Sequence, residues 1–266
     1  MTGSAETQFA EGNLATAVSL ATQAVKNQPR DAKQRTFLVE LLCFAGEVDR
    51  ARAQLDTLSI IVPESRWGAE HLIRLITGEQ IRRQVLAGGR PVSWIAAPSV
   101  LAEALAGGLL ALGAGHLADA AEIFSRAELA RPPIAGSHDA VVFADFRDLD
   151  DRLGSATEVI TDAGDYGWLP MEDIAQIQFR PTQLARDLIW RSARIRTVAG
   201  ETHQSFVPAL YPASDMDADS IKLGRETSWS QPVEGIFLGA GRKLILVGET
   251  DLDLLQLWKL EFGAPS

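Results

Sequence analysis

Four aspartates and two arginines lie within thirteen residues, in the stretch FADFRDLDDRLGS from residue 143 to residue 155. Clustered carboxylates can hold a divalent cation or carry acid-base chemistry, and clustered opposite charges can instead pair with each other where two parts of a chain meet. The interleaved Arg147 and Arg152 neutralise part of the negative charge, which suits an ion-paired seam and disfavours a cation site. We therefore interpret the stretch as a junction, with a divalent-cation-dependent hydrolase that uses the Asp145 to Asp151 cluster as the alternative.

The other residues that could do chemistry lack the spacing that chemistry requires. The turn Gly239-Ala240-Gly241-Arg242 lacks the Gly-Lys-Ser/Thr ending of a phosphate loop and is predicted to close a β-hairpin. No serine has the flanking glycines of a hydrolase nucleophile. The histidines show no metal-ligand spacing, and they are His71, His116, His138 and His203. The sequence thus predicts no catalytic residue, no metal and no cofactor.

Cys43 is the single cysteine and lies in the apolar segment FLVELLCFAG. One cysteine excludes an intrachain disulfide and a multi-cysteine zinc site. A cysteine within an apolar helical pattern behaves as a small hydrophobic residue, so we expect Cys43 in the core.

The chain is acidic and of ordinary globular composition. Its 266 residues carry a formal net charge of −10, and 46% of them are hydrophobic. Because this charge repels phosphate, nucleic acid is not expected as a partner. The first residues lack the basic and apolar regions of a signal peptide, and the most apolar run, 100–114, is too short to span a bilayer. A cytoplasmic protein without a membrane segment is expected.

A pattern of six positions recurs three times in the first half, starting at Gly12, Gly46 and Gly115. Each glycine is followed by an apolar residue at +2, alanine at +5, an apolar residue at +8 or +9, another at +12, and proline at +17. In the first copy these positions hold Leu14, Ala17, Leu20, Ala24 and Pro29. Glycine suits the turn between two helices, alanine permits their close approach, and proline ends the unit. The pattern looks like tetratricopeptide repeats, each a helical hairpin.

Between the second and third copies, the stretch AEHLIRLITGEQIRRQVLAGG has helical periodicity but no clean repeat, so a divergent helix pair is expected there. The groove of such a repeat domain commonly accepts a peptide or a helix. Alternatively, these helices only pack against the second half of the chain.

The second half changes to the alternation and turn signals of short strands. TEVITDAGDYGWLPM and ARIRTVAGETHQSFVPALY each read as a hairpin, and LLQLWKLEF as a last strand or a helix. We therefore predict an α+β fold, with a helical TPR-like repeat domain at 1–142, a junction at 143–155, and a smaller β-rich domain at 156–266, built as a bent sheet or small barrel.

Large aromatic residues in the second half can anchor either the core or an interface, and core packing is the simpler interpretation. Arg186 and Arg225 are expected to pair with aspartates across the junction. The structural or interaction candidates are Asp145, Arg147, Asp151, Arg152, Trp168, Trp190, Tyr211, Arg225 and Trp229.

Several short segments follow one another in a specific order: FADFRDLDDRLGS, YGWLP, RDLIWRSA, PALYP, LGRETSW and the closing LEF. Together with the N-terminal repeats and RAQLDTL, they resemble the ImpE/TagJ family of type VI secretion accessory proteins, from about residue 8 to residue 262. The resemblance implies a non-catalytic bacterial adaptor that binds the N-terminal helix of the small sheath subunit, TssB, and is linked to the sheath-disassembling ATPase ClpV. It supplies no set of binding residues. The acidic surface favours a partner helix that carries basic residues.

Overall fold

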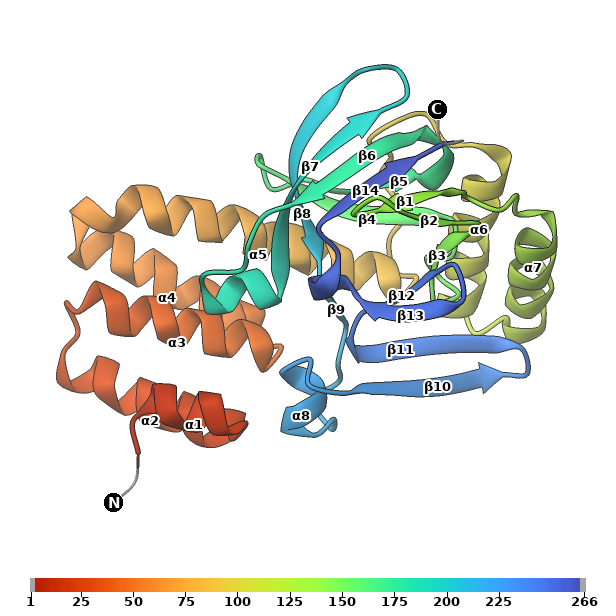
Figure 1. The fold of residues 1–266 in the computed structure, drawn as a ribbon. Helices are drawn as coiled ribbons and strands as arrows, with labels where there is room; N and C mark the ends of the chain where they lie inside the picture. Colours follow the sequence, from red (N-terminus) through yellow and green to blue (C-terminus); the bar gives the residue numbers. More distant parts are fainter. Residues whose placement is uncertain (1–2, 264–266) are drawn as a thin grey trace.

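The computed structural model describes residues 3–263, which form seven helices of two or more turns in the first half and a strand-rich second half (Figure 1). The helices are α1 (Ala5–Glu11), α2 (Leu14–Asn27), α3 (Ala32–Phe44), α4 (Val48–Ile61), α5 (Arg66–Leu86), α6 (Val100–Gly113) and α7 (Leu117–Ala130). The predicted α+β class is confirmed.

The three predicted hairpins are α1–α2, α3–α4 and α6–α7. Their turns are made by Gly12, Gly46 and Gly115, which adopt φ angles of 93°, 81° and 78°. These angles lie in the left-handed region, which glycine enters without steric cost, so the recurrent glycine has a backbone reason. The alanines at +5 are fully buried where the paired helices approach, and they are Ala17, Ala51 and Ala120. The prediction of TPR-like repeats is confirmed.

The expected divergent helix pair around residue 80 is wrong, because one continuous helix, α5, occupies the stretch. Gly78, the residue most able to break it, lies in the middle of the helix and packs on the sheet. A Cβ at Gly78 would approach Cγ2 of Ile160 to 2.5 Å. This glycine therefore allows α5 to approach the sheet closely, and it does not form a turn. Figure 1 shows α5 between the stack of α1–α4 and the strands, with α6 and α7 at the opposite end of the molecule.

The main sheet has eight antiparallel strands in the order β2-β1-β14-β6-β7-β8-β4-β5. Its strands are β1 (Gly136–His138), β2 (Val141–Phe143), β4 (Ala156–Thr161), β5 (Tyr166–Pro170), β6 (Ile174–Phe179), β7 (Trp190–Thr197), β8 (Thr202–Pro208) and β14 (Lys259–Phe262). The predicted hairpins β4–β5 and β7–β8 are both present. The strands begin at Gly136, before the expected junction at 143, and β1 pairs with the last strand, β14.

Two three-stranded sheets complete the second half, in the orders β10-β11-β9 and β13-β12-β3. Their strands are β3 (Phe146–Asp148), β9 (Leu210–Tyr211), β10 (Thr227–Val233), β11 (Ile236–Arg242), β12 (Leu244–Val247) and β13 (Thr250–Asp253). The short helices of this half are η2 (Met171–Asp173), η3 (Ala185–Leu188), α8 (Asp219–Lys222) and η4 (Leu254–Gln256).

The predicted hairpin turn at residues 239–242 is wrong, because these residues lie within β11. The turn before β11 uses Gly235, with φ 84°, and β11 pairs with β10. Gly239 serves packing instead: a Cβ there would clash with the ring of Tyr211. The last segment, LLQLWKLEF, divides into the short helix η4 and the strand β14.

One hydrophobic core is shared by the repeat helices and the sheet, and a second fills the space between the main sheet and β12. Trp168, Trp190 and Tyr211 belong to the shared core, and each is at most 2% exposed. Cys43 is buried in the same core, as predicted, and burial raises the pKa of its thiol. Within residues 3–263, no helix is both long and apolar enough to cross a membrane.

Candidate interaction surface and the charged junction

The first charged residue of the stretch 143–155, Asp145, forms an ion pair with Arg131. Nη1 and Nη2 of Arg131 donate to the two oxygens of Asp145 at 2.7 and 2.6 Å, and the backbone N–H of Ile134 donates to Oδ1 at 2.9 Å. Hydrogen bonding from Arg131 is the main cause that lowers the pKa of Asp145 to about 2. The Asp145 carboxylate therefore holds the segment that follows α7 against the start of β3.

Arg147 joins the same stretch to α7 by pairing with Glu128 at 2.8 Å and with Asp151 at 2.8 Å. The other oxygen of Asp151 accepts from the backbone N–H of Phe237 at 2.7 Å, and this bond attaches the stretch to β11. The arrangement is an ion-paired seam between elements distant in sequence. Within the part of the chain that the structure describes, no three His, Cys, Asp or Glu residues are grouped so as to hold a metal ion.

Arg152 and Asp150 form a buried pair after β3. Nε and Nη2 of Arg152 donate to Asp150 at 2.8 and 2.5 Å, and Asp150 also accepts from the N–H of Gly239 at 2.8 Å. Both side chains are shielded from solvent, so they stabilise the turn and anchor β11.

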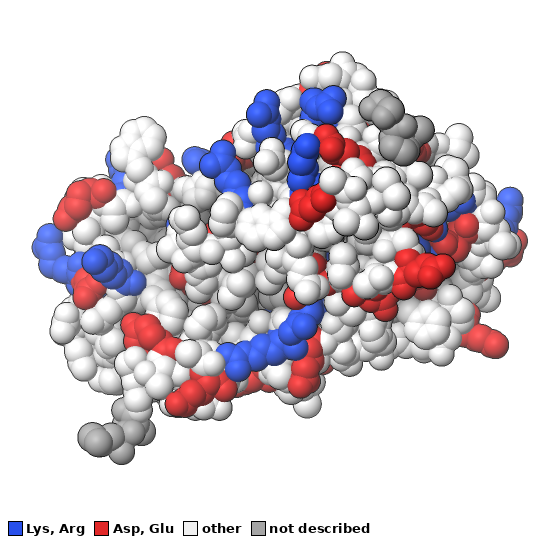
Figure 2. Space-filling view, viewed as in Figure 1, with Lys and Arg blue, Asp and Glu red and all other residues white. Residues whose placement is uncertain are grey.

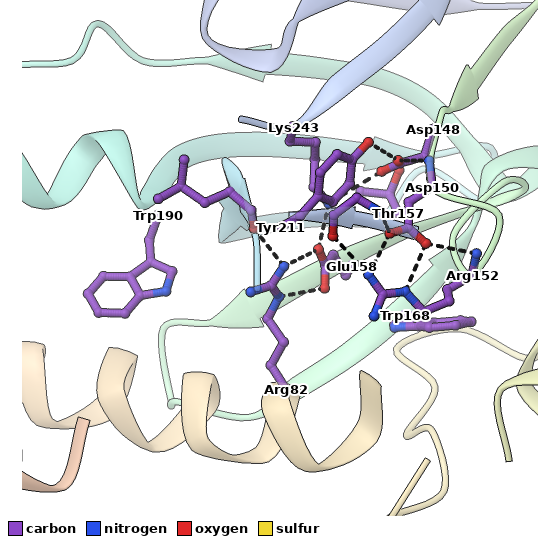
Figure 3. A network of polar contacts seen from close by, with 12 residues as sticks. Arg82, Asp148, Asp150, Arg152, Thr157, Glu158, Trp168, Trp190, Tyr211 and Lys243 are labelled. Atoms are coloured by element: carbon purple, nitrogen blue, oxygen red, sulfur yellow. Dashed lines mark hydrogen bonds and ion pairs between the residues drawn. The ribbon is translucent and has the colours of Figure 1, made fainter. Parts of the chain in front are cut away.

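A network of buried charges lies behind this seam, where α5 meets the sheets (Figure 3). At its centre is Glu158 of β4, which accepts from Nε and Nη2 of Arg82 at 2.7 and 2.9 Å and from Nζ of Lys243 at 2.5 Å. Lys243 also lies 3.3 Å from Asp148, which accepts from the hydroxyl of Tyr211 at 2.5 Å. Burial alone would raise the pKa of Glu158, but the charges of Arg82 and Lys243 lower it to about 2.

Further hydrogen bonds extend the network to three aromatic residues and to the repeat helices. The hydroxyl of Tyr166 donates to Glu158 at 2.9 Å and accepts from Nε1 of Trp168 at 2.7 Å. Nε1 of Trp190 donates to Glu79 of α5 at 3.2 Å. These indoles thus have buried polar partners, which explains why tryptophan occupies core positions here.

The network is balanced in charge, and all of its members are buried except Arg83, whose side chain is 30% exposed. Its cations are Arg82, Arg83, Arg152 and Lys243, and its carboxylates are Glu79, Asp148, Asp150 and Glu158. Buried charges are tolerated when each has partners of opposite sign and hydrogen bonds. Because the groups other than Arg83 are buried and all of them are mutually paired, their arrangement suits a structural joint.

Arg225 crosses from the second half to the repeats, but its partners are not aspartates as expected. Its Nη2 donates to the carbonyls of Phe9 and Ala10, at the end of α1, at 2.9 and 2.7 Å. Asp219 accepts from the N–H of Ala15, at the start of α2, at 3.1 Å. The carbonyl end of a helix attracts a cation and the amide end attracts an anion, which accounts for this correction.

Arg186 also reaches the repeats, where it pairs with a glutamate, Glu40 of α3, at 2.9 Å. Glu40 is 7% exposed, and burial raises its pKa despite the neighbouring Arg186. Leu188 and Leu223 pack on the same core as Phe9. The chain's own η3 and α8 segments therefore cover part of the face of α1–α5 that could otherwise receive a partner.

The hairpin α6–α7, in contrast, has an apolar groove of about 570 Å³. Its lining includes Leu101, Ala104 and Gly107 of α6 and Ile123, Ala127 and Ala130 of α7. At Gly107 an added Cβ would meet no atom within 4 Å. Val100, at the same surface, is 86% exposed. In the repeat stack α5 packs against α4, whereas no element among residues 3–263 fills this groove.

Comparisons with known proteins agree with this architecture. A family model described as ImpE protein matches residues 140–261, and a tetratricopeptide repeat model matches residues 8–69. The chain is 31% identical over 266 residues to the type VI secretion system accessory component TagJ of Pseudomonas aeruginosa, covering 97% of this chain and 90% of that relative. The chain belongs to the ImpE/TagJ family.

The fold of this ImpE/TagJ family member has also been seen in a crystal structure. A protein from Vibrio parahaemolyticus superimposes with a TM-score of 0.90 at 29% identity, covering 98% of each chain. The agreement extends over both halves, so the placement of the repeat helices against the sheet is shared.

Sequence reasoning missed the residues at the centre of this family member's joint. Glu79 and Arg82 continue the helical stripe of Leu72, Leu75 and Ile76, all of which are buried. The sequence did hold one signal: charged residues stand at positions of the helix that should face the core. Because buried charges require partners, these positions indicate a buried ion pair. The stripe could not reveal that those partners come from β4, which supplies Glu158, and from β7, which supplies Trp190.

Proposed function

We propose that this chain is a non-catalytic accessory protein of a bacterial type VI secretion system, and that it acts in the cytoplasm by binding the N-terminal helix of the small sheath subunit, TssB. Family membership and the similarity to the relative named TagJ support the secretion role. The observation that carries the binding mode is the open apolar groove between α6 and α7.

The groove has the chemistry that an incoming helix requires. Its floor is made largely of small residues, Ala104, Gly107, Ala127 and Ala130, which let a helix approach closely. Leu101 and Ile123 supply larger apolar contacts. An amphipathic helix with apolar residues at i, i+3, i+4 and i+7 would bury its apolar side there and add a third helix to the hairpin, as α5 does for α3–α4.

Charge around the groove supports a partner helix with basic residues on its other faces. Glu103 of α6 is exposed and the whole chain carries a net charge of −10, whereas Glu122 of α7 pairs with Arg126, which lines the groove. Long-range attraction of this kind accelerates association more than it increases affinity. Binding the sheath subunit by one helix would leave the rest of that subunit free, which is compatible with a link to disassembly by ClpV.

The binding mode is tested by titrating a synthetic peptide of the TssB N-terminal helix into the full chain in a calorimeter at low salt. Gly107→Trp should fill the groove without disturbing the fold, because no atom lies within 4 Å of an added Cβ. We expect it to weaken peptide binding at least tenfold. Gly68→Trp is the matched control, since Gly68 lies on α5 and is equally open.

Two outcomes separate the parts of the proposal. If neither the peptide nor the intact sheath subunit binds the wild-type chain, the adaptor function is wrong. If both bind, and Gly107→Trp binds as tightly as Gly68→Trp, the adaptor function stands and the α6–α7 groove is not the site.

A further inference from the structure

A second surface lies on the β-rich half, in a cleft of about 440 Å³ between the two three-stranded sheets. One wall is the face of β11 and β10 that carries Phe237 and Trp229, and the other is formed by Leu244 and Asp251 of the β12–β13 hairpin. Leu149, in the loop after β3, joins the two walls. The stretch 143–155 thus contributes to the cleft as well as to the ion-paired seam.

The aromatic wall is held in place by glycine and tyrosine beneath it. Trp229 lies opposite Gly239 in the β10–β11 ladder, and its ring centroid is 5.7 Å from that of Tyr211. Tyr211 is fixed in turn by its hydrogen bond to Asp148. Trp229 is nevertheless 39% exposed and Phe237 is 48% exposed. Two large aromatic side chains on a supported strand pair are typical of an interface anchor.

The charge of the cleft is negative. Of its lining residues, Arg147 is positively charged and Asp151 and Asp251 are negatively charged, so the sum is −1, and Arg147 already pairs with Asp151 and with Glu128 of α7. The side chain of Asp251 makes no hydrogen bond or ion pair with any other described residue, and Glu249, two residues before it, is exposed. Figure 2 shows acidic side chains gathered over the ends of the β10–β11 and β12–β13 hairpins.

We propose that this cleft binds a short segment of a protein partner in which an arginine or lysine adjoins an apolar residue. The long aliphatic stem of the basic residue would lie on Trp229 and Phe237, and its cationic head would reach Asp251. An aromatic face attracts a cation as well as apolar carbon, and a free carboxylate completes the pairing. The cleft is separate from the α6–α7 groove, and this proposal does not depend on the proposed function.

The test uses the full chain and a fluorescein-labelled hexapeptide, Gly-Arg-Leu-Arg-Leu-Gly, with Gly-Glu-Leu-Glu-Leu-Gly as the acidic counterpart, measured by fluorescence polarisation at low salt. We expect the basic peptide to bind at least tenfold more tightly than the acidic one. Asp251→Lys and Phe237→Ser should each weaken binding of the basic peptide at least fivefold. Both residues are exposed, so unchanged melting temperatures are expected to show that the variants remain folded.

Glu64→Lys is the control, because it changes the net charge by the same +2 as Asp251→Lys at an exposed position on η1 (Pro63–Ser65), far from the cleft in sequence and fold. It should leave binding within twofold of the wild-type value. The proposal is overturned if the two peptides bind equally, or if Asp251→Lys and Phe237→Ser bind the basic peptide as tightly as Glu64→Lys does. The latter result would mean that only diffuse attraction to an acidic protein holds the peptide.

Discussion

Arg82 of α5 and Glu158 of β4 form a two-point ion pair, with N–O distances of 2.7 and 2.9 Å, at a position where both side chains are at most 3% exposed. Nη2 of Arg82 also donates to the carbonyl of Leu210 at 2.7 Å. One guanidinium therefore joins the repeat helices to two strands of the second half. Because a buried pair of this kind is intolerant of losing one member, the two halves are expected to unfold together.

Replacing Arg82 with methionine should be strongly destabilising. The variant keeps much of the side-chain volume but leaves Glu158 and Glu79 short of a buried partner, which costs about 3–5 kcal/mol. The free energy of unfolding from urea titration measures the loss. Arg126→Met is the control, since Arg126 pairs with Glu122 at the surface of α7, and it should cost less than about 1 kcal/mol.

The double variant Arg82→Met, Glu158→Gln tests whether the two residues act as a pair. If they do, the double variant should lose less stability than the sum of the two single losses. Strict additivity would show that each side chain matters only through its other contacts.

Acid should remove the contribution of Glu158. The pKa of Glu158 is lowered to about 2 in the folded chain, below that of an unfolded glutamate, so its stabilisation is fully present above about pH 4.5 and is lost as the pH falls towards 2. The free energy of unfolding should therefore differ between wild type and Glu158→Gln by about 3 kcal/mol more at pH 7 than near pH 2. A difference that does not change with pH would contradict the assignment of Glu158 as the buried anion.

For Glu40, the contribution to folding stability should change with pH in the opposite direction. Burial raises its pKa, so the folded chain binds its proton more tightly than the unfolded chain does. Its contribution is present at low pH and is lost as the pH rises through the folded value. Relative to Glu40→Gln, the wild-type chain should therefore gain stability on acidification, which urea titrations at the same pH values would detect.

The contacts of Asp219 and Arg225 with the ends of α2 and α1 predict a local effect on the first repeat. Asp219→Ala and Arg225→Ala should each cost about 1 kcal/mol, because each removes a charged partner from a helix terminus. Hydrogen exchange of the α1 and α2 amides, followed by mass spectrometry, should accelerate in both variants. Lys222→Ala in the same short helix is the control, since the side chain of Lys222 bonds, among residues 3–263, only to the carbonyl of Asp215.

The sequence predicted the local elements better than the contacts between them. Gly12 and Gly46 could be placed in turns because positive φ is a local requirement that glycine meets. Gly239 and Gly78 were misread or left unexplained because their role is to admit Tyr211 and Ile160, which lie far away in the chain. A glycine required by packing is indistinguishable in sequence from one required by a turn.

In the candidate site, too, the local pairs could be predicted from the sequence and the contacts between distant elements could not. The charged stretch 143–155 was expected to be an ion-paired seam, and the sequence could suggest this because Arg147 and Arg152 lie among the aspartates. The partners Glu128 and Arg131 lie on α7 and at its end, and nothing local points to them. Trp168 and Trp229 both lie in strand-like segments, yet one is fully buried and the other is 39% exposed, a difference that depends on which sheet each strand joins.

Adjacent glycines in α6 should respond oppositely to the same substitution. Gly107→Ala should stabilise the chain by roughly 0.5–1 kcal/mol, because alanine has the higher helix propensity and an added Cβ meets no atom within 4 Å. Gly108→Ala gains the same propensity, but its methyl would lie 3.0 Å from Cε1 of Phe124 and 3.1 Å from Cγ2 of Ile123, so these packed side chains of α7 must shift, at a cost that offsets the gain. Melting temperatures of the two variants measure the contrast. The two positions are neighbours in one helix, so the gain in helix propensity is the same for both variants. The difference between their melting temperatures therefore shows which face of α6 is packed and which is open. Equal increases in melting temperature would mean that α7 does not press on Gly108, and the groove beside Gly107 would then lose its defined wall.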